Sequence, residues 1–224
     1  MGHTDHMPPA SSVLRPGLRT FKPRRSRITP RQRRALTDRS HPFKTPEELT
    51  RDWPTDRPVI IDIGFGSAEP VIDLATAFPE QTIVAVDVHS PGIGDLVDRC
   101  RTDDVGNVFV VEADALDLLA ELPHEAAGFR SFFPDPWPKS RHHKRRLVQP
   151  PVVDAIHDHL TAGGYWHIAT DWAQYAESII ELFDADERWS GGIIERPSWR
   201  PVTHFERRAI RDGREVFDMW FERR

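Results

Sequence analysis

The stretch that decides the fold reads PVIIDIGFGSAEPVIDLATAFPEQTIVAVDV and spans residues 58–88. It contains two apolar runs of strand length, 58–64 and 82–88, separated by a helix-length segment at 69–78. Both runs are nearly continuous in Val and Ile, which is typical of strands buried on both faces. Two such strands joined by a helix form the parallel strand–helix–strand unit of α/β proteins.

The same alternation continues toward the C-terminus. Further strand-length runs lie at 107–113, 129–133 and 165–171, and helix-length segments lie at 92–101, 115–122, 152–160 and 173–183. The last run, 214–223, alternates polar and apolar residues well enough to be a closing antiparallel strand at or near the sheet edge. We therefore predict an α/β fold with a mostly parallel sheet and helices on both faces.

The chain of 224 residues fits one catalytic domain with a tail. Residues 1–55 are rich in arginine and proline and show little apolar periodicity, so we predict a basic arm that is largely disordered or loosely docked. Residues 56–224 are predicted to form the domain. No apolar run is long enough to span a bilayer, no export signal is visible, and Cys100 is the single cysteine. We expect a cytoplasmic protein without membrane contact.

The charge of the chain is unevenly distributed. The net charge of −5 alone argues weakly against nucleic-acid binding. However, nine basic residues and no acidic one lie between Arg15 and Arg34, and five more lie between Lys139 and Arg146. The first group is either a solvated arm or an RNA contact, and the sequence leaves both open.

Carboxylates follow each predicted parallel strand at its carboxyl end, namely Asp62, Asp87, Asp114, Asp135 and Asp171. Ligands of open parallel sheets bind outside these ends, so we expect the five side chains along one rim. Each alone could equally cap the following helix. Together with the Gly64-Phe65-Gly66 turn, which allows close backbone approach, they indicate a ligand site.

The charge of this rim indicates a cationic ligand. The dinucleotide fingerprint requires a third glycine where this chain has Glu69, and a pyrophosphate would be repelled by Glu69 and Asp62. S-adenosyl-L-methionine carries a sulfonium and an ammonium group, which an acidic rim attracts. By position, Asp87 is expected to accept from the ribose hydroxyls and Asp114 from the adenine amino group.

A second feature is the segment FPDPWPKSRHHKRR at 133–146. Asp135 lies between two prolines, which fix φ and remove backbone donors, so its carboxylate is expected on a rigid turn. Trp137 is either a stacking surface for a base or a core aromatic residue. The basic residues that follow are expected to contact phosphates, whereas His142 and His143 lack a third ligand, so no metal site is expected.

Five segments match one known family. IDIGFGS, VDVHSPGIG, FFPDPWPKSRHHKRRLVQ, ATDWAQYAE and RPVTHFERR, in this order, closely resemble the bacterial tRNA (guanine-N7)-methyltransferases. The resemblance covers about residues 58–224. It implies a class I methyltransferase (Rossmann-like) fold, S-adenosyl-L-methionine as the methyl donor, and N7 of a guanine in the tRNA variable loop as the acceptor.

The resemblance also implies site residues. It assigns cofactor binding to Asp62, Gly64, Gly66, Asp87, Asp114 and Asp135. Asp135 is also the expected catalytic residue. Substrate contacts are expected from Lys139, Asp171, Thr203, His204, Phe205 and Glu206. The chain departs from the family where Asp62 and Asp87 replace the usual Glu, Ala68 replaces a glycine and His204 replaces a lysine.

Guanine N7 has an in-plane lone pair and no proton, so its attack requires alignment rather than a general base. Asp135 is therefore expected to orient the site. Asp171 or Glu206 is expected to accept from guanine N1–H and the 2-amino group.

The sequence leaves other functions open. One is an amino-group methyltransferase of adenine or cytosine, although the segment FPDPW lacks the adjacent prolines of that signature. Another is a non-catalytic RNA-binding protein on the same fold. An NAD-dependent dehydrogenase is disfavoured by Glu69 and the missing glycine. The oligomeric state is open, with a monomer favoured.

Overall fold

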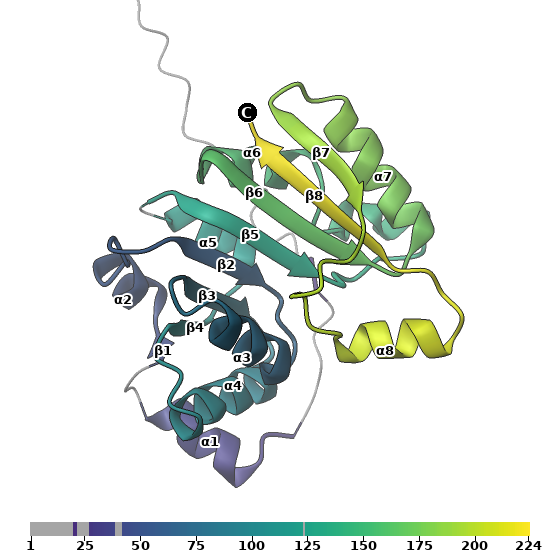
Figure 1. Cartoon of the computed structure of the whole chain (residues 1–224). Helices are drawn as coiled ribbons and strands as arrows, with labels where there is room; N and C mark the ends of the chain where they lie inside the picture. Colours follow the sequence, from purple (N-terminus) through teal and green to yellow (C-terminus); the bar gives the residue numbers. More distant parts are fainter. Residues whose placement is uncertain (1–19, 22–26, 39–41, 123) are drawn as a thin grey trace, which may run out of the picture.

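The computed structural model describes residues 20–21, 27–38, 42–122 and 124–224. Its centre is an eight-stranded sheet in the order β1-β4-β3-β2-β5-β6-β8-β7 (Figure 1). The strands are β1 (Phe43–Lys44), β2 (Val59–Ile63), β3 (Thr82–Asp87), β4 (Val108–Glu112), β5 (Ala126–Phe132), β6 (Leu160–Thr170), β7 (Trp189–Ile194) and β8 (Phe217–Arg223). Strands β1 to β6 pair in parallel, and β8 runs antiparallel to β6 and β7. The predicted fold class is confirmed.

Helices cover both faces of the sheet. They are α1 (Pro30–Thr37), α2 (Pro46–Arg51), α3 (Ala68–Ala77), α4 (Ser90–Thr102), α5 (Ala115–Glu121), α6 (Pro150–Asp158), α7 (Ala173–Asp184) and α8 (His204–Arg211), with a short 3₁₀ helix η2 (Ser140–Arg145). Successive residues of a strand point to opposite faces. In β3, Val84 and Val86 therefore join the core under α5, α6 and α7, whereas Ile83 and Ala85 join the core under α1, α3 and α4.

The arm carries regular structure that the sequence pattern did not predict. Helices α1 and α2 each begin with a capping box, formed by Thr29 with Gln32 and by Thr45 with Glu48. Gly94 of α4 allows α1 to lie close, because a Cβ atom there would come within 2.9 Å of the Gln32 Cβ. The boundary near residue 55 stays a prediction, and residues 1–19, 22–26 and 39–41 of the arm lie outside the described chain.

Strand β7 was not predicted either. Its sequence, WSGGII, contains Gly191 and Gly192 at positive φ, and glycines inside a strand weaken its signal. β7 forms the edge of the sheet, so β8 is the second strand from that edge. The predicted closing antiparallel strand near the edge is thereby confirmed.

Charged side chains are buried on the half of the sheet beside α3. Arg130 of β5, His167 of β6 and Asp218 of β8 lie there, covered by the segment 195–203 that leads into α8. Arg200 of this segment is fully buried and pairs with Asp218 at 2.7 Å and with Glu206 of α8 at 2.7 Å. This pair of contacts fixes the start of α8 against the sheet.

We expect Arg200→Met to destabilise the protein by about 3–5 kcal/mol, because it leaves two buried carboxylates without their cation. Urea unfolding measures the loss. Arg196→Met is the matched control, because Arg196 contacts the same Glu206 at 3.6 Å from a 39% exposed position. Its expected cost is below about 1 kcal/mol. Equal losses in the two variants would contradict this account of the buried pair.

Candidate active site

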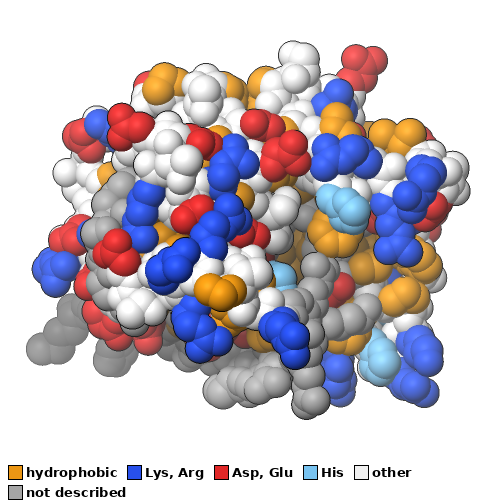
Figure 2. Space-filling view, turned by 90° about the horizontal axis from the view of Figure 1, so that it is seen from below, with side chains coloured by type: hydrophobic (Ala, Val, Ile, Leu, Met, Phe, Trp, Pro, Cys, Tyr) orange, Lys and Arg blue, Asp and Glu red, His pale blue; other side chains and the backbone are white. Residues whose placement is uncertain are grey.

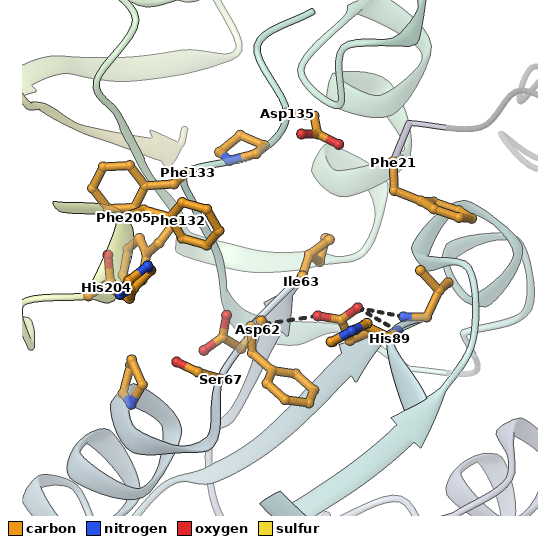
Figure 3. Close-up of a pocket in the computed structure, with 18 of the residues that line it drawn as sticks. Phe21, Asp62, Ile63, Ser67, His89, Phe132, Phe133, Asp135, His204 and Phe205 are labelled. Atoms are coloured by element: carbon orange, nitrogen blue, oxygen red, sulfur yellow. Dashed lines mark hydrogen bonds between the residues drawn. The ribbon is translucent and has the colours of Figure 1, made fainter. Parts of the chain in front are cut away.

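A cleft of about 330 Å³ opens at the carboxyl ends of β2, β3 and β5. Between β2 and β5 the strand order reverses, since β3 and β4 extend to one side of β2 and β6 extends beyond β5. Such a reversal is where open α/β sheets bind their ligands. The volume falls in the range of small-molecule sites. Figure 3 shows the Asp62 and Asp135 side chains at this cleft, with Phe205 on one side and Phe21 on the other.

The structure brings most of the predicted site residues together. Those that line the cleft are Asp62, Gly64, Gly66, Asp87, Asp135, Thr203, His204 and Phe205. Those outside its lining are Asp114, Lys139, Asp171 and Glu206. Three of the four carboxylates predicted to gather around the methyl donor therefore share one cleft, although the role of each residue stays a prediction.

Asp62 is the most deeply buried carboxylate of the cleft, with 3% of its surface exposed. Burial raises its pKa from 3.8 to about 6, and the nearby Asp87 carboxylate adds to the increase. The guanidinium of Arg130 acts in the opposite direction and lowers the pKa of Asp62. A buried anion of this kind is stabilised by a cationic ligand.

Asp87 connects two loops of the cleft. Its Oδ2 accepts from the backbone N–H of Gly66 at 2.9 Å, and its Oδ1 accepts from Val88 N at 2.7 Å and from His89 N at 2.9 Å (Figure 3). These bonds hold the glycine turn after β2 against the end of β3. The carboxylate is thus fixed at the position where the sequence predicts a ribose contact.

The glycine turn depends on two glycines with different functions. Gly66 has φ +69°, a conformation that favours glycine, and a Cβ atom there would lie 3.8 Å from the Phe205 ring. Gly92, in the first turn of α4, allows the turn to approach that helix, because a Cβ atom there would come within 2.6 Å of the Gly66 carbonyl oxygen. The Phe205 ring also stacks on the Phe133 ring, with 6.3 Å between the ring centroids. Helix α8 therefore closes one side of the cleft.

Asp135 lies on a turn with unusual backbone geometry. Phe133 and Trp137, two residues before and after it, have φ values of +57° and +45°. Non-glycine residues rarely adopt this region, and such strain is concentrated at functional sites. The turn therefore fixes the Asp135 carboxylate at the cleft, as the two flanking prolines predict.

Trp137 is a buried residue, with 6% of its surface exposed. Its indole N–H donates to the carbonyl of Thr20 at 3.2 Å, and the Arg145 guanidinium lies 5.1 Å from its ring centroid. Of the two readings of Trp137, the structure supports the packed aromatic residue and not an open surface for a base. Its contact holds the arm residue Thr20 at the cleft.

The predicted residues outside the lining have other contacts. Asp114 caps α5 by accepting from Leu116 N at 3.0 Å. Asp171 forms an ion pair with Arg214. Glu206 is buried and pairs with Arg200, whereas Lys139 is exposed just before η2.

Other residues that line the cleft were not predicted from the sequence. They are Thr20, Phe21, Ile28, Ile63, Phe65, Ser67, Pro70, Val88, His89, Ser90, Pro91, Phe132, Phe133, Pro134 and Leu147. Those on the loops adjoin predicted residues, and their position after a strand was a usable signal. Phe21 and Ile28 come from the arm, more than thirty residues before β2, and no spacing pattern connects them to the sheet.

In the described part of the chain, no group of three or more His, Cys, Asp or Glu side chains is arranged to hold a metal ion. Among the same residues, no helix has the length and apolar character needed to cross a bilayer.

The sheet order, the glycine turn and the carboxylate at the end of β3 define a class I methyltransferase fold. Solved structures agree. An rRNA methylase from Streptococcus thermophilus matches with a TM-score of 0.53 and 15% identity, covering 80% of this chain and 97% of that one. The aminoglycoside resistance methyltransferase NpmB1 matches with a TM-score of 0.55 and 20% identity, covering 80% and 93%.

Sequence comparison defines the family. Residues 56–219 match the family described as "Putative methyltransferase". The tRNA (guanine-N(7)-)-methyltransferase of Thiobacillus denitrificans is 40% identical over 96% of this chain and 99% of its own length. The protein of the same name from Alkalilimnicola ehrlichii is 41% identical over 96% of both. The chain belongs to the tRNA (guanine-N(7)-)-methyltransferase family.

The raised pKa of Asp62 leads to a prediction about stability. Because the folded protein binds this proton more tightly than the unfolded chain, the Asp62 charge destabilises the fold increasingly as the pH rises from about 4 to 7. We expect Asp62→Asn to stabilise the ligand-free protein at pH 8 by up to about 3 kcal/mol, with no difference below about pH 4. Urea unfolding at both pH values measures this.

The same variant should bind S-adenosylmethionine roughly ten- to a hundredfold more weakly, because a charged hydrogen-bond acceptor is lost. Unchanged stability would show that burial does not raise the pKa of Asp62, and unchanged affinity would show that its charge does not contribute to binding.

Proposed function

We propose that this protein transfers the methyl group of S-adenosyl-L-methionine to N7 of a guanine in the variable loop of tRNA, in the cytoplasm. The proposal rests on one observation. An acidic cleft lined by Asp62, Asp87 and Asp135 opens beside surface elements rich in Lys and Arg, so a cationic donor and a polyanionic acceptor have adjacent sites. Membership in the family supports the choice of donor and acceptor.

The cleft residues fit S-adenosylmethionine by their chemistry. Asp62 would hold the ammonium group, and Asp87, already fixed by three backbone N–H groups, would accept from the ribose hydroxyls. Asp114 lies at the end of the next strand and is assigned to the adenine amino group. When bound, the donor supplies an electrophilic methyl group.

The acceptor requires alignment rather than proton removal, because guanine N7 presents a lone pair without a proton. Alignment of the reacting atoms can lower a barrier by about 7–11 kcal/mol in favourable cases. The strained turn around Asp135 would supply this alignment, with the Asp135 carboxylate orienting both ligands. His204 and Thr203, at the start of α8, border the same space and are assigned to the acceptor together with Phe205.

Selection of guanine requires an acceptor for N1–H and the 2-amino group. Glu206 is poorly suited, because its carboxylate is buried and paired with Arg200 at 2.7 Å. Asp171 is part-exposed and pairs with Arg214, itself part-exposed. We therefore assign guanine recognition to Asp171, and we assign Glu206 to holding the start of α8.

The direct test is transfer of a labelled methyl group from S-adenosylmethionine to two tRNAs that differ at the variable-loop guanine. The expected product is 7-methylguanosine from the tRNA with the guanine and none from the tRNA with adenine there. Asp135→Asn should lower the rate by at least about a hundredfold while the protein stays folded. Methylation of both tRNAs, or a normal rate for the variant, would contradict the assignment.

Two measurements distinguish the other functions. Formation of N6-methyladenosine would support the amino-group methyltransferase. Absence of S-adenosylmethionine binding in calorimetry, with tRNA binding retained, would support a non-catalytic RNA-binding protein.

Basic side chains border the cleft from three directions. Ile28 beside α1, His204 of α8 and Asp135 before η2 all line it. The exposed basic residues near these points are Arg27, Arg31, Arg33, Arg34, Lys139, Arg141, Lys144, Arg145, Arg207, Arg208 and Arg211. Figure 2 shows one face of the molecule, on which Lys and Arg side chains are interspersed with Asp and Glu side chains. We propose that tRNA phosphates bind across this basic surface.

The arm is the least obvious part of this surface, so it provides the test. We expect Arg33→Ala/Arg34→Ala to weaken tRNA binding and to reduce the slope of log affinity against log salt by about 2, since two phosphate contacts are lost. Arg51→Ala/Arg57→Ala is the control, because both arginines are exposed and Arg57 precedes the amino end of β2, whereas the cleft lies at its carboxyl end. Equal slopes for all three proteins would exclude α1 from the RNA surface.

A further inference from the structure

A row of paired residues crosses the sheet beneath the cleft. Asp62 of β2 is in register with Arg130 of β5, Arg130 with His167 of β6, and His167 with Trp220 of β8. Paired residues of neighbouring strands point to the same face of a sheet. Asp62 lies at one end of this row, and its side chain lines the cleft.

Arg130 is a buried cation in an unusual environment. It is 1% exposed, and its guanidinium lies 5.4 Å from the Trp199 ring centroid and 5.8 Å from that of Phe78. Its Nη2 donates to the Tyr165 hydroxyl at 3.3 Å. Its Nε and Nη1 have no hydrogen-bond partner, and it forms no ion pair within 4 Å, among the residues that the structure describes.

Arg200, another buried arginine, shows the contrast. Arg200, on the same face, is neutralised by Glu206 and Asp218 at 2.7 Å each. Buried guanidinium groups are normally paired in this way. Aromatic rings hold the Arg130 guanidinium in place, but they leave its charge to act on the nearest carboxylate along the row, which is Asp62.

We propose that Arg130 is a positioning residue for the methyl-donor site, and that its uncompensated charge keeps the buried Asp62 ionised so that Asp62 can bind the cationic donor. Arg130 does not line the cleft and touches no ligand there. It acts through Asp62. This inference rests on the proposed function, since it requires a cationic ligand at Asp62.

Other charged or titratable groups face Asp62 from the elements around it. They are Asp87 at the end of β3, His89 before α4, Asp135 after β5 and His204 of α8, which line the same cleft. The carboxylates oppose ionisation of Asp62. Arg130 is thus the permanent cation placed directly beside Asp62 on the sheet.

The test compares Arg130→Met, Arg130→Lys and the unchanged protein. Calorimetry measures the dissociation constant of S-adenosylhomocysteine, which keeps the ammonium group, at intervals between pH 5 and 8.5. For the unchanged protein we expect affinity to fall as the pH drops through about 6, where Asp62 gains its proton. For Arg130→Met the midpoint should rise by about one pH unit or more, because an opposing charge is lost.

Arg130→Lys retains the charge and should restore the midpoint, which a purely structural role of the side chain does not predict. His89 and His204 are present in all three proteins, so the difference between them reports on Asp62. Where Arg130→Met does not fold, Arg130→Gln replaces it, because its side chain is polar but carries no charge. Equal midpoints in the charged and uncharged variants would overturn the inference. Absence of binding by every protein at every pH would instead overturn the proposed function.

Discussion

The ligand site depends on one electrostatic arrangement, a carboxylate buried near the carboxyl end of the central strand β2. Removing a carboxylate from water disfavours its charge, so Asp62 is held in a state that a cationic ligand relieves. The sheet creates this site where its strand order reverses, between β2 and β5. The surrounding loops then determine what reaches it: a glycine turn fixed by Asp87 on one side, and a strained, proline-flanked turn carrying Asp135 on the other.

The two halves of one sheet face bury different kinds of side chain. Over β2, β3 and β4, helices α3 and α4 bury an apolar core in the ordinary way. Over β5, β6 and β8, the buried side chains are charged, and the segment 195–203 covers them. Arg200 holds α8 there through Glu206 and Asp218, which places Thr203, His204 and Phe205 at the cleft. A charged layer specifies one position of α8, because a shifted arginine would leave buried carboxylates unpaired.

The sequence predicted those parts of the fold and site whose signals are local. The runs around 58–64 and 82–88 appear as β2 and β3, and most of the carboxylates after strands reach one cleft, because parallel strands end at the same edge. Signals that depend on distant partners could not be found in this way. Arg200 joins Glu206 of α8 to Asp218 of β8, and the Trp137 N–H donates to Thr20 of the arm, and no spacing pattern in the sequence connects these residues. Strand β7 was missed because its two glycines weaken the local pattern.

On this basis the cleft selects its ligand by a positive charge near Asp62. Titration with S-adenosylhomocysteine and with 5′-methylthioadenosine tests it most directly, because both carry the adenosine and the thioether while the second lacks the ammonium-bearing chain. We expect 5′-methylthioadenosine to bind at least about a hundredfold more weakly at pH 8, a difference of about 2.7 kcal/mol or more. Similar dissociation constants for the two compounds would contradict it.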